Sequence, residues 1–215
     1  MRWHERLAMV IHALAMASLW LPWVDHKAAA LVLTGWDLPE FARFMPEARS
    51  GGLVIHAQAF WGPSLAFAFC VLTGGSTSRL GLKPALARLA VAAAVLAVPF
   101  PPIDQALAYA ACLAASAALL TTTSLSVRAR HAAILVAPAL GALASTLPPW
   151  QFRRLLPALQ QLYNAPITIG FGAWLCAGCA LTSLALAIRS LFQEVQAAFR
   201  GASEARSRRP ANPHS

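Results

Sequence analysis

Histidines and cysteines within apolar stretches are the residues of this chain whose types and spacing could do chemistry. His12 and His56 each fall within a long apolar run. A neutral imidazole there is a candidate ligand for a haem iron or a chlorin magnesium, or a hydrogen-bond partner for a quinone. Cys176 and Cys179 form a CxxC pattern, which is the spacing of a redox-active thiol pair.

A candidate metal site involves Asp25 and His26, which are neighbours in a polar connection. His56 falls near the same predicted membrane face, and two imidazoles with a carboxylate form a known ligand set for zinc. Such a trio is also common by chance in loops. We therefore expect no resident metal or cofactor.

The depths of the two apolar histidines argue against one shared haem. His12 lies about six residues from the inner end of its predicted span, or roughly 9 Å deep, and His56 lies roughly 5 Å from the outer end of its own. In a hydrocarbon core of about 30 Å, this leaves roughly 16 Å between them along the membrane normal. A hydrogen bond to a neighbouring helix is the more common role of such a histidine.

The four cysteines favour packing over thiol chemistry. The chain resembles quinone-linked membrane thiol oxidoreductases only in the CxxC and in its total of four cysteines, the other two being Cys70 and Cys112. Cys176 lies roughly 15 Å from the outer end of its span, near the midplane. The outer loops contain no cysteine, so they offer no thiol to relay a disulfide to a partner.

Catalytic and transport signatures are also missing from the sequence. The predicted spans contain no Asp or Glu at mid-depth, since Asp104 falls at an outer edge, whereas ion-coupled carriers generally place a carboxylate near the midplane. The sequence contains no GxSxG, HExxH, P-loop or GxGxxG motif. These absences count against a hydrolase, a metalloprotease and a nucleotide-binding enzyme.

The composition is that of a membrane protein. The chain has 215 residues, of which 58% are hydrophobic and 12% charged, with a mean hydropathy of +0.58. A soluble domain carries about twice that share of charged residues, so a soluble globular enzyme is excluded, and the hydrophobicity excludes disorder. We expect an all-α integral membrane protein without a separate soluble domain.

The apolar runs predict a single domain of six transmembrane helices over residues 1–190. The expected spans are residues 7–24, 53–73, 84–98, 103–127, 132–147 and 167–188. Residues 25–52 and 151–165 connect spans on the outer side and have apolar residues at helical spacing, which predicts amphipathic helices lying on the membrane surface. Residues 191–215 are expected to form a basic cytoplasmic helix and a polar tail.

The basic residues predict that both termini are cytoplasmic. The termini and the loops after spans two and four, together with Arg88, which can snorkel from span three to the same side, hold 12 of the 17 Lys and Arg but three of the eight Asp and Glu. The opposite side holds five of each. The whole net charge of +9 therefore falls on one face, as the positive-inside rule describes. Among the residues on this face, those expected to meet lipid headgroups are Arg128, Arg130, Arg200, Arg206, Arg208 and Arg209.

Two alternatives to this topology remain open. Residues 1–17 have the basic start, apolar run and Ala-Met-Ala end of a cleaved signal peptide. The apolar run continues beyond Ala17, which favours an uncleaved span. Span three has about 15 residues and barely crosses the core, so spans three and four are alternatively one re-entrant hairpin.

The function that this pattern favours is that of a non-catalytic accessory or structural subunit of a larger complex in the bacterial inner membrane. Small residues at helix-packing spacing, such as Ala137 and Gly141, suit close association with other membrane subunits. A small permease or exporter is the first alternative, because Pro63 and Pro138 could kink helices around a path. An intramembrane redox or cofactor-binding protein is the second. The expected partners are the lipid bilayer and other membrane proteins, and no nucleic acid.

Overall fold

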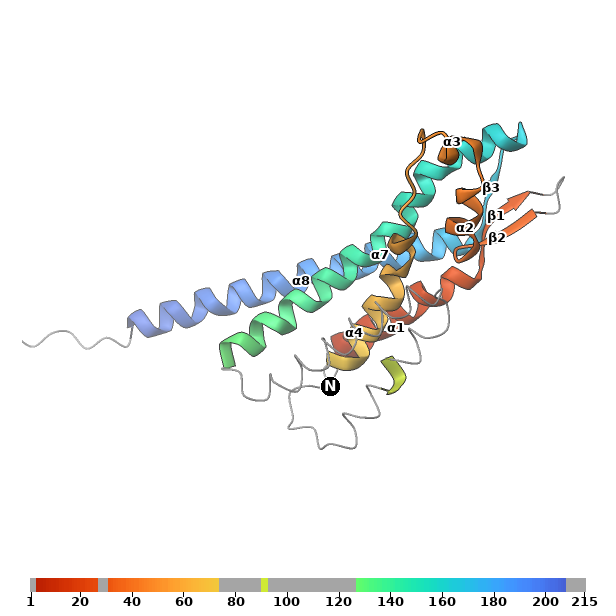
Figure 1. The fold of residues 1–215 in the computed structure, drawn as a ribbon. Helices are drawn as coiled ribbons and strands as arrows, with labels where there is room; N and C mark the ends of the chain where they lie inside the picture. The colour runs from red at the N-terminus through yellow and green to blue at the C-terminus, as the bar shows by residue number, and fades with distance from the viewer. Residues whose placement is uncertain (1–2, 27–30, 74–89, 93–126, 208–215) are drawn as a thin grey trace, which may run out of the picture.

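A computed structural model of the chain describes residues 3–26, 31–73, 90–92 and 127–207, and most of this part is helical (Figure 1). The elements in chain order are α1 (Trp3–Ala17), η1 (Ser18–Trp20), β1 (Pro22–His26), β2 (Leu31–Thr34), α2 (Asp37–Arg43), α3 (Pro46–Arg49), η3 (Ala57–Trp61), α4 (Gly62–Thr73), α7 (Val127–Tyr163), β3 (Thr168–Ile169) and α8 (Phe171–Ser207).

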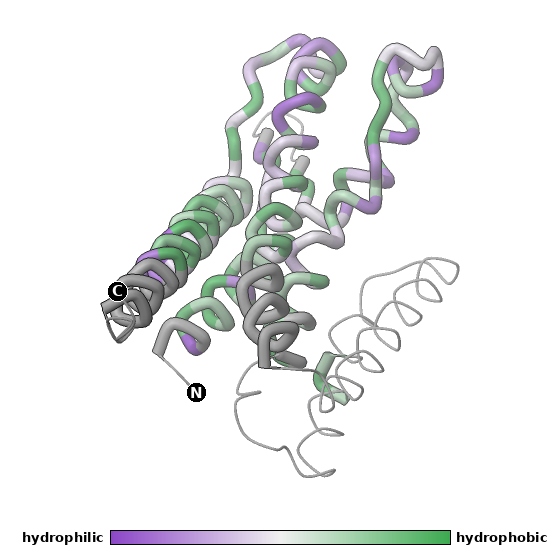
Figure 2. The backbone as a smooth tube through the Cα atoms, turned by 90° about the vertical axis from the view of Figure 1, so that its left-hand side faces the viewer, coloured by the Kyte–Doolittle hydropathy of each residue, from purple (hydrophilic) through white to green (hydrophobic). Residues whose placement is uncertain are grey.

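Four helices, α1, α4, α7 and α8, pack against one another as a bundle. The first residues of α1 and α7 and the last residues of α4 and α8 lie at one end of this bundle (Figure 1). The other end of the bundle holds the sheet, the short helices α2 and α3, residues 50–61 and the last turns of α7. We call this end the cap. Hydrophobic residues follow the bundle part of α8, and hydrophilic residues gather in the cap (Figure 2).

A small antiparallel sheet in the cap pairs a strand that follows the first helix with a strand that precedes the last helix. Its strand order is β2-β1-β3, with Asp25 paired to Val32 on one side and to Thr168 on the other. The amide of Gly170 donates to the carbonyl oxygen of Trp23 at 2.9 Å. The start of α8 is therefore fixed beside the end of the first helical segment.

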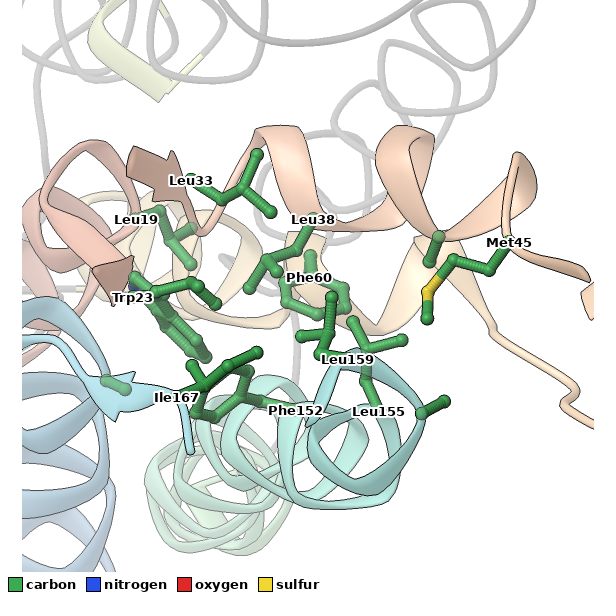
Figure 3. Close-up of a cluster of buried hydrophobic side chains, with 14 of the residues drawn as sticks. Leu19, Trp23, Leu33, Leu38, Met45, Phe60, Phe152, Leu155, Leu159 and Ile167 are labelled. Carbon is green, nitrogen blue, oxygen red and sulfur yellow. The ribbon is translucent and has the colours of Figure 1, made fainter. Parts of the chain in front are cut away.

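The cap has its own hydrophobic core, centred on the fully buried Trp23 (Figure 3). Its indole meets the ring of Phe152 edge-on, with centroids 5.4 Å apart, and a tilted Phe60 at 5.9 Å. The other large side chains of the cluster are Leu19, Val24, Leu33, Leu38, Met45, Leu155, Leu159 and Ile167. This core draws on segments from both halves of the chain.

The two outer connections differ from their prediction. The helices expected within residues 25–52 are present as α2 and α3, but they follow the unexpected strand β2, which pairs with β1, and residues 151–163 continue α7 instead of forming a separate helix. The apolar side chains expected to lie on the membrane surface, such as Leu38 and Leu159, are buried against each other. Phe44 and Leu162 of the same two segments stay exposed, so only part of each apolar face is buried in this core.

Span five, expected at residues 132–147, and the outer segment expected at residues 151–165 are not separated at Pro148-Pro149, the residues between them. Helix α7 runs without interruption from Val127 to Tyr163, past Pro138 as well. Proline lacks an N–H, so Pro148 leaves the carbonyl of Ala144 without its usual helical partner. Gly62 packs directly against this carbonyl oxygen, and a side chain there would separate α4 from α7.

The described residues contain one helix that is long and apolar enough to cross a membrane, Phe171–Gln193. A shorter apolar helix covers Arg6–Trp20, because β1 takes over from Pro22 where span one was expected to reach residue 24. Span two begins in an extended segment and is helical from Ala57. Nearly all of spans three and four lies outside the described residues, so the six-span arrangement stays a prediction.

Candidate functional site

His12 is the buried titratable group at the centre of the bundle. Its side chain is fully buried and bridges two other helices. Its Nδ1 lies 3.3 Å from the Oγ of Ser145 on α7, and its Nε2 lies 3.1 Å from the Oγ of Ser183 on α8. A neutral imidazole has one N–H and one lone pair, so one hydroxyl accepts a hydrogen bond from the ring and the other donates one. We call these three residues the His12 cluster.

Glycine makes room for this ring. A Cβ at Gly141 would lie 3.2 Å from Nε2 of His12 and 3.5 Å from Cβ of Ala66. Helices α1, α4, α7 and α8 therefore all meet at the level of the cluster. Small residues allow this close approach, and the buried hydrogen bonds fix which residues face each other.

This geometry leaves His12 poorly suited to hold a cofactor. A metal ligand must offer a ring nitrogen lone pair, and both nitrogens of His12 already face serine hydroxyls. His56 is exposed and lies in the cap, just before η3. The structure places the two histidines in different parts of the molecule, His12 inside the bundle on α1 and His56 just before η3.

The proposed ligands Asp25 and His26 lie on β1, where Asp25 is exposed. The backbone of His26 pairs with Leu31, and its side chain lies outside the described part. No group of three His, Cys, Asp or Glu side chains that could hold a metal ion occurs among the described residues.

Cys176 and Cys179 are free thiols on the face of α8 that packs against α1. Both are buried, and Cys179 packs with Ile11 and Ala15. Cys70 on α4 is also free, and Cys112 lies outside the described residues. In this arrangement the CxxC acts as a pair of small packing residues.

A second close approach between backbone segments lies where α8 begins. A Cβ at Gly172 would lie 2.7 Å from the carbonyl oxygen of Ser18 and 2.7 Å from Cδ1 of Trp23, and a Cβ at Gly170 would clash with the carbonyl of Pro22. The indole Nε1 of Trp23 donates to the carbonyl oxygen of Ser18 at 2.8 Å. The two glycines therefore let α8 start directly on the turn between η1 and β1.

The basic residues expected at the cytoplasmic face fall at one end of the bundle. Arg128 and Arg130 lie at the start of α7, and Arg200 and Arg206 lie near the end of α8. These two helix ends share the end of the bundle where α1 begins (Figure 1). Their side chains, and all of Arg208 and Arg209, lie outside the described part.

Sequence reasoning missed Ser145 and Ser183, which complete the His12 cluster. They are 133 and 171 residues away from His12 along the chain, and serine is too common in membrane helices to single them out. Comparisons of the chain with protein-family models, with curated proteins and with solved structures find no match. Its function is therefore inferred from its own residues.

Proposed function

We propose that the chain is a multi-pass protein of the bacterial inner membrane that serves as a non-catalytic accessory subunit of a larger membrane complex. The observation that carries this proposal is the His12 cluster. Its buried polar groups bond to one another and hold three helices together. The most buried polar centre of the bundle thus has a packing role.

The outer surface of the bundle supports membrane embedding. Large apolar side chains are exposed on three of its helices. A soluble protein seldom exposes so much apolar area. They are Val10 and Leu14 on α1, Leu140, Leu143 and Leu147 on α7, and Phe171, Trp174 and Leu181 on α8. Apolar residues outside and hydrogen-bonded polar groups inside suit a lipid surrounding.

The cap supports the role of a subunit. It is a folded unit with its own core at one end of the bundle, and it keeps apolar side chains such as Phe44 and Val54 exposed. A rigid cap with exposed apolar residues suits docking to another protein outside the bilayer. Among the described residues of the cap, no group of three His, Cys, Asp or Glu side chains could hold a metal ion.

The test is native mass spectrometry of the tagged chain extracted gently from its own membrane. We expect a mass well above the 22.8 kDa of the chain, with other polypeptides in fixed ratio. As a control, membranes from untagged cells grown on heavy isotopes are mixed with the sample before extraction. True partners should carry only light isotopes, because they were bound to the tagged chain before the membranes were mixed. A particle containing this chain alone would overturn the proposal.

A small permease is the second candidate, and one buried group favours it. The hydroxyl of Ser64 on α4 is fully buried without a hydrogen-bond partner, and Pro63 precedes it. A polar group left unpaired in a bundle is a candidate contact for a solute. Solute flux into vesicles containing only the purified chain, abolished by Ser64→Ala, would replace the subunit proposal.

A further inference from the structure

Helix α8 carries two opposite stripes of residues. One stripe faces α1 and is buried, and includes Ala173, Cys176, Cys179, Ala180 and Ser183. The opposite stripe, which we call the α8 stripe, is exposed and consists of Phe171, Trp174, Gly178, Leu181, Ala185, Ile188, Phe192 and Val195. The described part of the chain leaves this second stripe open.

The spacing of the α8 stripe is that of a coiled-coil seam. Successive members are separated alternately by three and four residues from Phe171 to Val195, which is the a/d pattern of the heptad repeat. All eight positions of this stripe hold an apolar residue or glycine, whereas the exposed residues beside it include the polar Thr182, Arg189, Gln193 and Gln196.

The stripe also continues past the apolar part of the helix. Arg189, Gln193 and Gln196 are exposed around it, whereas Phe192, with 63% of its surface exposed, and Val195 keep the heptad positions apolar. Helix α8 extends 14 residues beyond Gln193, the end of its candidate span. Leu191, which is 55% exposed, borders the stripe, and an apolar stripe flanked by polar residues is typical of packing against another helix.

We propose that two copies of this chain pair through the α8 stripe as a parallel coiled coil. This inference rests on the proposed membrane embedding, because two copies inserted with one topology run parallel in the bilayer. In that register, identical residues face each other: small Gly178 and Ala185 in the middle, and large residues such as Trp174 and Phe192 toward the ends. Small residues at the centre let the two helices approach closely.

The flanking positions favour this self-pairing. The residues beside the seam include Leu184, Arg189, Leu191 and Gln196. In a parallel pair, Arg189 of one copy lies beside Leu184 of the other, and Leu191 lies beside Gln196. No like charges meet, and the stem of Arg189 covers apolar surface while its head reaches water.

The room at Gly178 agrees with a second copy. A Cβ at this position would meet no atom within 4 Å. No described residue of the same copy therefore requires a glycine here, although glycine weakens a helix by about 1 kcal/mol relative to alanine. A helix of a second copy that approaches closely at this point supplies the reason.

The test is disulfide cross-linking in native membranes, with Cys70 and Cys112 replaced by alanine. In this background, Val195→Cys is expected to give a band of twice the chain mass under mild oxidation, because its position lies in the seam. Gln193→Cys is the matched control, since it is exposed two residues away and off the seam. Equal cross-linking of both variants, or none with Val195→Cys, would overturn the pairing.

A second variant separates pairing from folding. Gly178→Leu should lower the Val195→Cys dimer band at least fivefold without lowering the thermal unfolding temperature of the single chain, because no described residue touches this position. An unchanged dimer band would contradict the proposed seam. The cross-linking and the mass measurement test the two proposals separately. Cross-linked copies without other polypeptides would support the pairing of α8 and overturn the subunit proposal. Other polypeptides without cross-linking would support the subunit proposal and overturn the pairing.

Discussion

Nε2 of His12 lies 3.1 Å from the Oγ of Ser183, across 171 residues of sequence. The contact joins the first and last helices of the bundle, and Ser145 joins α7 to the same ring. Because both partners are buried, these bonds fix the relative heights of α1, α7 and α8. A helix that slides by one turn would leave the imidazole without a partner among apolar side chains.

We expect His12→Ala to lower the free energy of unfolding by about 2–4 kcal/mol, because it removes two hydrogen bonds and leaves a cavity. Ser183→Ala should lower it by about 1 kcal/mol. The loss of unfolding free energy in the double variant should be about 1 kcal/mol smaller than the sum of the losses in the two single variants, and this difference is the coupling energy of the pair. The measurement is equilibrium unfolding in mixed micelles titrated with a denaturing detergent.

His56→Ala is the control for this cycle, because His56 is exposed in the cap and should change the unfolding free energy by less than about 0.5 kcal/mol. Strictly additive effects of the His12 and Ser183 substitutions would contradict the His12 cluster. Purified protein with a visible absorption band that His12→Ala abolishes would restore the cofactor role.

The contrast between the His12 cluster and the cap shows what the sequence can predict. His12 itself was found as a candidate, because a polar residue in an apolar run is conspicuous. Its partners were not, because they depend on how α7 and α8 pack. The strand Leu31–Thr34 was missed for a similar reason: its alternation of exposed Val32 and buried Leu33 extends over too few residues to be told from a helical pattern.

The course of α7 was mispredicted at Pro148-Pro149 for a physical reason. A proline pair normally ends or kinks a helix, because it removes backbone donors and crowds the preceding turn. Here the freed carbonyl of Ala144 lies against Gly62, and the segment after the prolines is held by the cap core through Phe152 and Leu155. The tertiary contacts that outweigh the local signal come from residues far away in the sequence.

We expect Gly62→Ala to destabilise the fold by about 3 kcal/mol or more, because its Cβ would clash with the rigid carbonyl of Ala144. Gly178→Ala is the matched variant on another helix, with no atom within 4 Å of the added carbon. In the single chain it should be neutral or stabilise by up to about 1 kcal/mol, as expected for alanine in a helix, and its effect on the proposed pairing is measured separately by cross-linking. Similar unfolding temperatures for the two variants in detergent would contradict the α4–α7 contact.

Trp23 should dominate the stability of the cap. We expect Trp23→Ala to lower the free energy of unfolding by about 3–5 kcal/mol through loss of the central side chain. Trp23→Phe should lower it by about 1–2 kcal/mol, because the hydrogen bond from Nε1 to the carbonyl of Ser18 is lost. Limited proteolysis within the cap should be faster in Trp23→Phe than in the unsubstituted protein, and fastest in Trp23→Ala.

Trp150 provides the comparison for Trp23. It is exposed and stacks with the guanidinium of Arg154, whose Cζ lies 5.2 Å from the ring centroid. Trp150→Ala should lower the unfolding free energy by about 1 kcal/mol at most. A larger loss from Trp150→Ala than from Trp23→Ala would place the cap core elsewhere.

The proposed topology predicts that the cap and the end of α8 lie on opposite sides of the membrane. With Cys70 and Cys112 replaced by alanine, Val54→Cys in the cap should react with a membrane-impermeant maleimide added to intact spheroplasts, because Val54 is 53% exposed. Gln193→Cys should react only after permeabilisation, because the excess of basic residues holds the end of α8 in the cytoplasm. The remaining Cys176 and Cys179 are buried against α1, so the unsubstituted background should stay unlabelled. Labelling of both positions from the same side would mean that α8 does not cross the bilayer, and it would overturn the membrane arrangement on which the parallel pairing of α8 depends.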